Sequence, residues 1–214
     1  MDLQLNNKKA LVTGSTKGIG RAIAETLARE GAEVIINGRT EKSVKDAVSE
    51  IKKDIQKAVI SGIACDFSQP AEIDRLIASC GDIDILINNV GIFEPKNFLD
   101  IPDEDWLRFY EVNVMSGVRL SRAFLPYMLK QDWGRIIFIS SESGINIPVE
   151  MVHYGMTKTA QLALSRGIAE TTKGTNVTIN SVLPGPTLSE GVRKFAEIGG
   201  ENSREEVEKG FFKT

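Results

Sequence analysis

Short apolar runs alternate with longer amphipathic segments along most of the chain. The apolar runs, which are typical of buried strands, lie at 9–13, 33–36, 58–65, 83–87, 135–139 and 176–182. The segments that repeat apolar residues at three- and four-residue steps, which favours helices, lie at 21–29, 41–56, 71–79, 103–130 and 151–172. The alternation of strands with helices predicts an α/β fold, a doubly wound parallel sheet with right-handed crossovers. No internal repeat or linker interrupts the 214 residues, so we expect a single domain.

The composition is that of an ordinary globular protein, and it excludes several classes of function. Hydrophobic residues make up 42% of the chain, and the net charge of -3 gives no reason to expect nucleic acid or an anionic membrane surface as a partner. No apolar run approaches the roughly 20 residues of a membrane span, and the N-terminus lacks the apolar core of a signal peptide. Cys65 and Cys80 lack metal-ligand spacing and are predicted to be buried free thiols. We therefore expect a cytoplasmic protein without a metal site.

A glycine-rich turn follows the first apolar run, immediately before the first predicted helix. Its spacing is G-x-x-x-G-x-G, in which glycines permit a tight turn and free N–H groups at the helix start can receive a pyrophosphate. A plain loop is the alternative, but the position between a buried strand and a helix favours nucleotide binding. The candidate cofactor-binding residues of this turn are Gly14, Ser15, Lys17, Gly18, Ile19 and Gly20.

The residue that follows the second predicted strand bears on the choice of cofactor. NAD-binding domains place an acid about 20 residues past the glycines, whereas an arginine nearby accommodates the 2′-phosphate of NADP. Arg39 stands at this distance from Gly20, and Lys17 adds a second cation on the same side. We therefore predict NADP(H) in preference to NAD(H). The alternative, that both are solvated surface charges, gains some support from the neighbouring Glu41.

Tyr154 and Lys158 form the candidate centre of an acid–base site. They stand four residues apart in a predicted helix, so they share one face. A lysine ammonium this close stabilises phenolate over phenol, so we expect the tyrosine pKa to lie below its usual value of about 10. A tyrosine tuned in this way can exchange a proton with an alcohol or a ketone. The pair taken alone also fits a solvated tyrosine and lysine on a helix surface.

Other polar residues stand where predicted strands end, and each has a structural alternative. Asp66 follows the third strand, where it could accept a hydrogen bond from an adenine amino group or cap the next helix. Asn89 follows the fourth strand and could brace backbone or contact a ligand, and Gly91 lets a ring approach closely. Ser141 follows the fifth strand, at the edge where open parallel sheets bind ligands, although serine-rich turns are also simply turns. Asn113 lies inside the longest predicted helix, which indicates a kink or a polar role.

Taken together and in order, these motifs resemble those of the short-chain dehydrogenases/reductases, and the resemblance spans nearly the whole chain. The matching motifs are T-G-x-x-x-G-x-G from Thr13, Asp66, N-N-x-G from Asn88, Asn113, Ser141, Y-x-x-x-K from Tyr154, and P-G-P-T from Pro184. The resemblance, which extends to 3-oxoacyl-acyl-carrier-protein reductases, implies a Rossmann fold. It also implies an oxidoreductase that interconverts a ketone and a secondary alcohol by hydride transfer with NADP(H).

The resemblance implies a role for each candidate residue. Tyr154 would be the acid in ketone reduction and the base in alcohol oxidation, and Ser141 would polarise the substrate oxygen. Lys158 would lower the tyrosine pKa and hold the nicotinamide ribose, and Asn113 would hold a water that relays protons. The remaining cofactor-binding residues would be Asp66 at the adenine, Asn89 near the adenosine ribose, Gly91, and Pro184, Gly185 and Thr187 at the nicotinamide carboxamide.

Two departures from the family pattern bear on activity. Val90 replaces the usual alanine of N-N-A-G, and the sequence stops at Thr214, where family members usually continue with a helix and a seventh strand. We therefore expect a C-terminally shortened form, with 188–214 as a partial substrate lid. The alternative function is a catalytically impaired nucleotide-binding or regulatory protein. The resemblance further implies a small carbonyl, alcohol or acyl-thioester substrate, and a homodimer or homotetramer formed through the helices that carry Asn113 and Tyr154.

Overall fold

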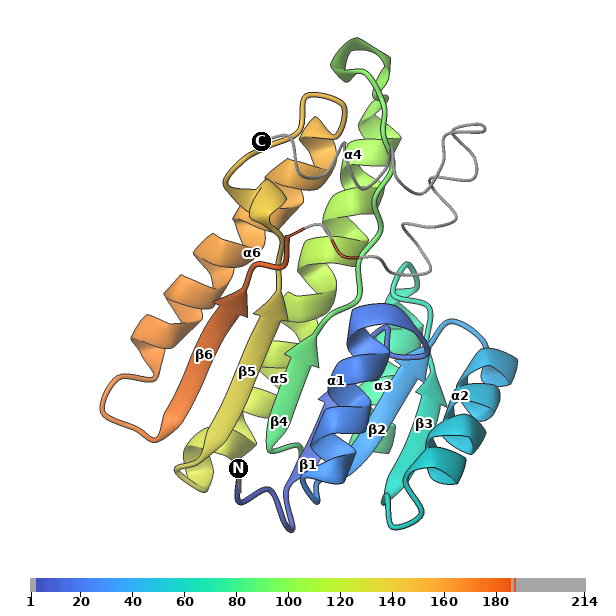
Figure 1. Ribbon diagram of the computed structural model, residues 1–214. Helices are drawn as coiled ribbons and strands as arrows, with labels where there is room; N and C mark the ends of the chain where they lie inside the picture. The colour runs from blue at the N-terminus through green and yellow to red at the C-terminus, as the bar shows by residue number, and fades with distance from the viewer. Residues whose placement is uncertain (1–2, 186, 188–214) are drawn as a thin grey trace.

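The computed structural model of the protein describes residues 3–185 and 187. Its centre is one six-stranded parallel sheet with the strand order β3-β2-β1-β4-β5-β6, flanked by helices (Figure 1). The strands are β1 Lys9–Val12, β2 Glu33–Gly38, β3 Ile60–Ala64, β4 Ile85–Asn88, β5 Gly134–Ile139 and β6 Val177–Val182. This architecture confirms the predicted doubly wound α/β fold, with six strands in the described part of the chain.

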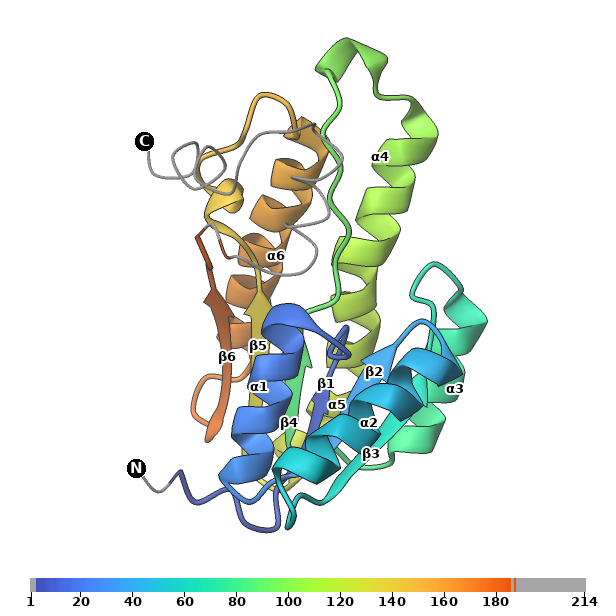
Figure 2. The same ribbon diagram turned by 45° about the vertical axis from the view of Figure 1, so that its right-hand side comes forward.

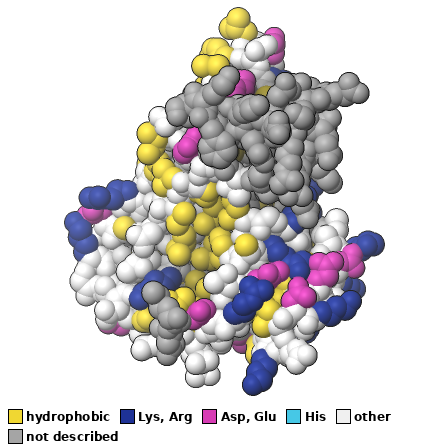
Figure 3. Space-filling view, in the orientation of Figure 1, with side chains coloured by type: hydrophobic (Ala, Val, Ile, Leu, Met, Phe, Trp, Pro, Cys, Tyr) yellow, Lys and Arg dark blue, Asp and Glu magenta, His cyan; other side chains and the backbone are white. Residues whose placement is uncertain are grey.

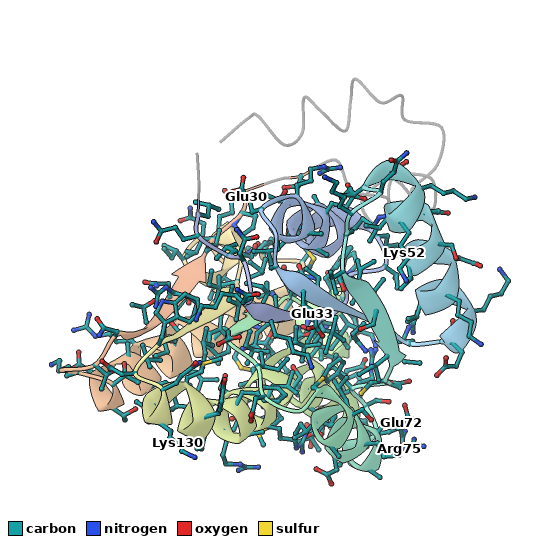
Figure 4. All side chains as sticks on the ribbon, turned by 90° about the horizontal axis from the view of Figure 1, so that it is seen from below. Glu30, Glu33, Lys52, Glu72, Arg75 and Lys130 are labelled. Atoms are coloured by element: carbon teal, nitrogen blue, oxygen red, sulfur yellow. The ribbon has the colours of Figure 1, made fainter. Side chains whose placement is uncertain are left out.

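Helices lie on both faces of the sheet, as the view along the strands in Figure 4 shows. The helices on one face are α1 (Gly18–Arg29) and α2 (Glu41–Asp54), and those on the other are α3 (Pro70–Cys80), α5 (Ser116–Lys130) and α6 (Val152–Thr171). α4 (Asp103–Tyr110) continues the line of α5 beyond the carboxyl ends of the strands (Figure 2). Two 3-10 turns lie in the loops at that end, η1 (Phe98–Asp100) and η3 (Glu142–Gly144). None of the described helices is long and apolar enough to cross a membrane.

The strand order reverses between β1 and β4, which lie side by side in the middle of the sheet. β1 pairs with β2 on one side and with β4 on the other. The chain adds β2 and β3 outward from β1, and then adds β5 and β6 outward from β4 in the opposite direction. In open α/β sheets a ligand binds at such a reversal, outside the carboxyl ends of the strands. The fold therefore predicts a ligand site among the loops that follow β1, β4 and β5.

The apolar core has two layers, one on each face of the sheet. Leu11 and Val12 are neighbours in β1 and face opposite layers, as the alternation of side chains along a strand requires. Both are fully buried, and burial of such a side chain contributes roughly 2 kcal/mol to stability. Cys65 and Cys80 are free thiols buried in the layer of Leu11, which confirms their predicted role. Burial raises the pKa of Cys65 to about 12 and that of Cys80 to about 11.

The face of the sheet that carries α1 is only partly covered by described helices. In Figure 1, α1 lies in front of β1 and α2 lies at the edge of the sheet beside β3, and no helix of residues 3–185 lies in front of β5 and β6. Figure 3 shows hydrophobic side chains gathered in the middle of this face. A cavity of about 550 Å³ runs along α1, and its lining residues are Gly18, Ile19, Ala22, Ile23, Thr26, Leu27 and Thr187. The segment predicted as a partial lid, 188–214, lies outside the described residues.

The structure corrects the long helix predicted over 103–130. A π-helical turn, η2 (Glu111–Met115), separates α4 from α5, and Asn113 stands at its centre. π-helical turns are rare and occur frequently at functional sites. The predicted irregularity at Asn113 is therefore confirmed, and its form is a wider helical turn rather than a kink.

The structure also shows that the buried face of α6 is not the apolar one. The three- and four-residue repeat that predicted this helix includes Ala163 and Gly167, and both are exposed. The buried residues of α6 are His153, Gly155, Thr157, Lys158, Gln161 and Ser165. The helix was predicted correctly, but most of the side chains that it turns towards the sheet and the π-helical turn are polar.

Candidate active site

The turn that joins β1 to α1 has the geometry of a phosphate cradle. Gly14 and Gly18 have φ values of 59° and 60°, in the left-handed region that glycine adopts without strain. α1 begins after Lys17, and within the described residues no side chain caps its first N–H groups. A Cβ atom at Gly20 would overlap Asn89 Nδ2 and lie 2.7 Å from the Gly14 carbonyl oxygen. The residues present therefore fit the pyrophosphate of a dinucleotide at this helix start.

Two asparagine side chains brace this turn from neighbouring strands. Asn89 donates through Nδ2 to the carbonyl oxygens of Thr13 (2.8 Å) and Gly14 (3.0 Å). Asn37, in β2, accepts through Oδ1 from the N–H of Gly14 (3.1 Å). The buried Ser15 hydroxyl donates to a carbonyl of β1 and accepts from the Asn37 N–H (2.9 Å). Asn89 thus has the bracing role that the sequence left open, and the Ser15 hydroxyl is also bonded within the protein.

Two cationic side chains stand where β2 ends and α1 begins. Arg39 and Lys17 are both exposed, and neither takes part in an ion pair within the described part of the chain. Asp66, after β3, accepts through Oδ1 from the N–H of Ser68 (2.9 Å), which forms a local turn. It does not cap α3, whose N-cap residue is Gln69. The capping alternative for Asp66 is therefore wrong.

Tyr154, Lys158 and Ser141 come together at the carboxyl end of β5. Tyr154 and Lys158 both belong to α6, and Lys158 Nζ lies 5.6 Å from the centre of the Tyr154 ring. Ser141 follows β5, and its side chain hydrogen-bonds Tyr154. Phe93 packs edge-on against the tyrosine ring, with 6.2 Å between the ring centres. Three of the four predicted catalytic residues thus form one cluster.

Burial shifts the pKa values of Tyr154 and Lys158 in opposite directions. It raises the pKa of Tyr154 above the usual value, and the hydrogen bond with Ser141 acts against this rise. It lowers the pKa of Lys158 to about 8, because the lysine is only 4% exposed. The predicted fall in the Tyr154 pKa is therefore wrong for the protein without ligands, because the loss of water around the tyrosine raises its pKa more than its neighbours lower it. Tyr154 is a phenol at neutral pH, which is the form that can donate a proton.

Asn113 is the fourth predicted catalytic residue, and the π-helical turn places it beside α6. Its Oδ1 accepts from the N–H of Ile92 (2.7 Å), and its Nδ2 donates to the carbonyl oxygen of Ile92 (2.9 Å). Nδ2 also donates to Thr157 Oγ1 (3.0 Å). The backbone carbonyl of Asn113 accepts from Gln161 Nε2 (2.6 Å), and Gln161 Oε1 accepts from Lys158 Nζ (3.3 Å). Asn113 is thereby connected to the lysine of the cluster through one amide.

The remaining predicted cofactor contacts lie in loops around this cluster. Gly91 stands beside the lysine amine, since an added Cβ atom would lie 3.5 Å from Lys158 Nζ. The carbonyl oxygen of Pro184 accepts from the N–H of Glu142 (3.1 Å), which joins the loop after β6 to the loop after β5. The other two predicted residues of this loop are exposed, Gly185 and Thr187.

Comparison with known proteins decides the family. The sequence model of the family described as short chain dehydrogenase matches residues 8–198. The chain belongs to this family. The uncharacterized oxidoreductase YvaG of Bacillus subtilis is 50% identical to it over 216 residues, which cover 100% of this chain and 82% of YvaG.

Two further relatives of this short-chain dehydrogenase carry names that describe an activity. The 3-oxoacyl-[acyl-carrier-protein] reductase FabG of Aquifex aeolicus is 36% identical, over 86% of this chain and 76% of its own. The crystal structure of L-sorbose reductase from Gluconobacter frateurii, complexed with NADPH and L-sorbose, matches with a TM-score of 0.90 at 29% identity. That match covers 98% of this chain and 81% of the reductase.

Two polar residues of this candidate site were not predicted from the sequence. Asn37 supports the glycine turn from β2, and Gln161 connects Lys158 to the π-helical turn. The available signal for Gln161 was its position seven residues after Tyr154, which places both on one helix face. No local pattern marked Asn37, because the group that it binds, the N–H of Gly14, lies 23 positions away in the turn after β1.

Proposed function

We propose that the protein is an NADP(H)-dependent oxidoreductase that interconverts a ketone and a secondary alcohol by hydride transfer. The observation that carries the proposal is the cluster of Tyr154, Ser141 and Lys158 at the carboxyl end of β5, in the same ring of loops as the phosphate cradle. Two relatives support it by name. One is a reductase whose structure contains NADPH and L-sorbose, and the other is a 3-oxoacyl-[acyl-carrier-protein] reductase.

In this proposal the residues of the site control the proton and the substrate oxygen. NADPH, when bound, supplies the hydride that reduces the carbonyl carbon. The Tyr154 hydroxyl donates its proton to the carbonyl oxygen, which Ser141 holds by a hydrogen bond. Lys158 stabilises the phenolate as it forms, and burial strengthens this interaction relative to water. Because burial keeps the Tyr154 pKa high, the phenol carries its proton at neutral pH, and this favours reduction.

The choice of NADP(H) over NAD(H) is supported by the charges at the end of β2. Arg39 is exposed and forms no ion pair with any described residue, so its guanidinium is available to a 2′-phosphate. Lys17 adds a second cation at the start of α1. The polar residue near the end of β2 is Asn37, whose side chain bonds the glycine turn, rather than a carboxylate that could accept from a ribose hydroxyl.

The proposal extends to the substrate class, the assembly and the location. The substrate is a small carbonyl or alcohol, or an acyl thioester. We also propose a homodimer or homotetramer formed through the helices that carry Asn113 and Tyr154. Leu107 and Tyr110 of α4 support this, since they are 69% and 43% exposed and an interface would remove them from water. Buried free thiols fit the reducing cytoplasm. Light scattering of the purified protein measures the assembly.

The substitution Tyr154→Phe tests the proposed chemistry. We expect it to slow NADPH-linked reduction of ketones by roughly 10²- to 10⁴-fold, because the general acid is lost. Cofactor affinity, measured by fluorescence titration with NADPH, should stay nearly unchanged. Tyr127→Phe is the matched control, since Tyr127 is a half-buried tyrosine of α5 outside the cluster.

Two outcomes would contradict this function, and they differ. Near-normal turnover by Tyr154→Phe would contradict the proposed acid–base role of Tyr154. A wild-type protein that binds NADPH but turns over none of a broad panel of ketones and 3-oxoacyl thioesters would instead favour the alternative function, a catalytically impaired nucleotide-binding protein.

A further inference from the structure

Gln161 lies on the inner face of α6, one helical turn beyond Lys158, and belongs to none of the motifs described above. Its side chain is 2% exposed. Oε1 accepts from Lys158 Nζ (3.3 Å), and Nε2 donates to the backbone carbonyl of Asn113 (2.6 Å). A single buried amide thus joins the amine of the acid–base cluster to the π-helical turn.

The two partners fix the orientation of this amide. The Lys158 amine donates its hydrogens, and the Asn113 carbonyl oxygen can only accept, so the amide oxygen has to face the lysine. Turning the amide of Gln161 by 180° would set donor against donor and acceptor against acceptor. Buried polar groups without partners are costly, so the observed orientation is the stable one. The bridge is therefore directional.

We propose that Gln161 is a positioning residue that holds Lys158 Nζ in place beside Tyr154 by anchoring it to the Asn113 carbonyl. This role rests on the proposed function, in which the lysine stabilises the phenolate. Among the described residues, Nζ has two acceptors, the carbonyl oxygen of Ile139 (3.0 Å) and Gln161 Oε1. Ile139 belongs to β5, so one acceptor fixes the amine from the sheet and the other fixes it from the helix.

The far end of the bridge is itself anchored. Asn113 Nδ2 donates to Thr157 Oγ1 (3.0 Å), and that hydroxyl donates to the carbonyl oxygen of Tyr154 (2.7 Å). Hydrogen bonds therefore run from the backbone of Tyr154 through Thr157 and Asn113 to Gln161 and on to Lys158. Such a chain of bonds in a low-dielectric interior is mutually strengthening. Movement of the Lys158 amine would therefore disturb its own bond to Gln161 and also the bond between Gln161 and Asn113.

The bridge also bears on the charge of the lysine. Burial lowers the pKa of Lys158 to about 8, and no charged side chain of the described residues offsets this. Tyr154 is the titratable group that faces the amine. Loss of the Gln161 acceptor would favour the neutral amine and lower the lysine pKa further, whereas a carboxylate at position 161 would favour the ammonium and raise it.

Two variants separate a positioning role from mere packing. Gln161→Met keeps the length of the side chain and removes both hydrogen bonds, whereas Gln161→Glu keeps an acceptor for Lys158. We expect Gln161→Met to lower kcat for NADPH-linked reduction about 10- to 100-fold, as for loss of a hydrogen bond to a charged group, with little change in KM. The alkaline limb of the pH–kcat profile, where Lys158 loses its proton, should move to lower pH in Gln161→Met and to higher pH in Gln161→Glu.

Ser165→Ala is the matched control, because it removes another buried polar group from the same face of α6. Its hydroxyl shares a hydrogen bond with Ser181 (2.7 Å) and is remote from the amine. We expect the pH profile of Ser165→Ala to match that of the wild type. A lower kcat in Gln161→Met without a shifted alkaline limb would indicate packing alone and overturn the proposal, as would an unchanged kcat. If Gln161→Met does not fold, Gln161→Glu alone tests the proposal: an alkaline limb at higher pH than in the wild type supports it, and an unshifted limb overturns it.

A second measurement separates this proposal from the proposed function. The pKa of Lys158 can be followed by NMR in protein labelled with ¹³C-lysine, with the resonance assigned by its absence in Lys158→Met. This titration needs no turnover. A wild-type protein that reduces no ketone would overturn the proposed function. A Lys158 pKa that is the same in the wild type and in both Gln161 variants would overturn the role of Gln161.

Discussion

The amine of Lys158 is buried in the protein interior. Comparison of the wild type with Lys158→Met should show how much this burial lowers the free energy of unfolding. The lysine is 4% exposed, and its amine donates to the carbonyl oxygen of Ile139 and to Gln161 Oε1. Burial lowers its pKa from 10.5 to about 8. The folded protein therefore loses this proton at a lower pH than the unfolded chain does. The methionine variant keeps most of the volume and has no proton to lose.

The pKa difference determines the sign and the size of the effect. Between pH 8 and pH 10.5 the unfolded chain binds the proton and the folded protein does not, so the free energy of unfolding rises with pH in this window. At about 1.4 kcal/mol per pKa unit, the full rise is roughly 3 kcal/mol, and roughly 1 kcal/mol of it is reached by pH 9. Below pH 8 both states hold the proton, and the folded state bears the whole cost of the buried charge.

Urea unfolding of the wild type and of Lys158→Met from pH 7 to pH 10 measures this rise. The titration of Cys65 and Cys80 is common to both proteins and cancels in the difference, which reports the lysine and its coupling to Tyr154. The raised pKa values of the two thiols make both proteins less stable as the pH rises above the values of the unfolded chain. We expect the wild type to gain roughly 2 kcal/mol or more over the variant by pH 10. Lys130→Met, at the end of α5 (Figure 4), shows the effect of the same change at an exposed site. A difference that stays flat with pH would refute the reasoning.

Two further substitutions test the cofactor site. Arg39→Asp replaces a cation with an anion at the end of β2, so we expect NADPH affinity to fall by roughly 10-fold or more relative to NADH in parallel titrations. An unchanged preference would contradict the 2′-phosphate assignment. Gly20→Ala places a Cβ atom against Asn89 and 2.7 Å from the Gly14 carbonyl, so we expect weaker NADPH binding and a loss of roughly 1–3 kcal/mol in unfolding free energy. Gly167→Ala, whose Cβ atom meets nothing within 4 Å, is the control, and equal NADPH binding by both alanine variants would count against the cradle.

The sheet was predictable because each of its strands coincides with a short apolar run that polar or amphipathic segments separate from the next. Each of the six runs overlaps one strand, and the order of strands and helices implied the doubly wound topology. The ends were less accurate, since the run 58–65 became Ile60–Ala64 and the run 33–36 became Glu33–Gly38. Strand ends depend on hydrogen bonds to partners far away in the sequence, which a local pattern does not contain. The π-helical turn at Asn113 was anticipated only as an irregularity, because residue type does not distinguish it from a kink.

The side chains of the proposed acid–base cluster lie together as the sequence predicted, but their electrostatics could not be predicted from it. The spacing of Tyr154 and Lys158 implied a common face, and the structure confirms it. The predicted direction of the tyrosine pKa was wrong, because spacing gives the distance to the lysine and says nothing of burial. Gln161 was missed because its contact with Asn113 spans 48 positions and joins two helical elements. Such a contact follows from the packing of α6 against η2, which no single segment encodes.

The polar inner face of α6 has a physical explanation in these contacts. Burying an amine, an amide and a hydroxyl is costly unless each is hydrogen-bonded, and here each has partners in a different element. Lys158 bonds β5, Gln161 bonds the π-helical turn, and Ser165 bonds β6. These bonds are directional, so they fix the rotation of the helix as well as its distance from the sheet. Leucines at the same positions would bury more apolar surface, but they would tolerate repacking and hold Tyr154 less firmly. The sequence of α6 thus gives up stability to hold the proposed acid–base group in place, and unfolding between pH 8 and pH 10.5, where Lys158 titrates differently in the two states, measures that loss.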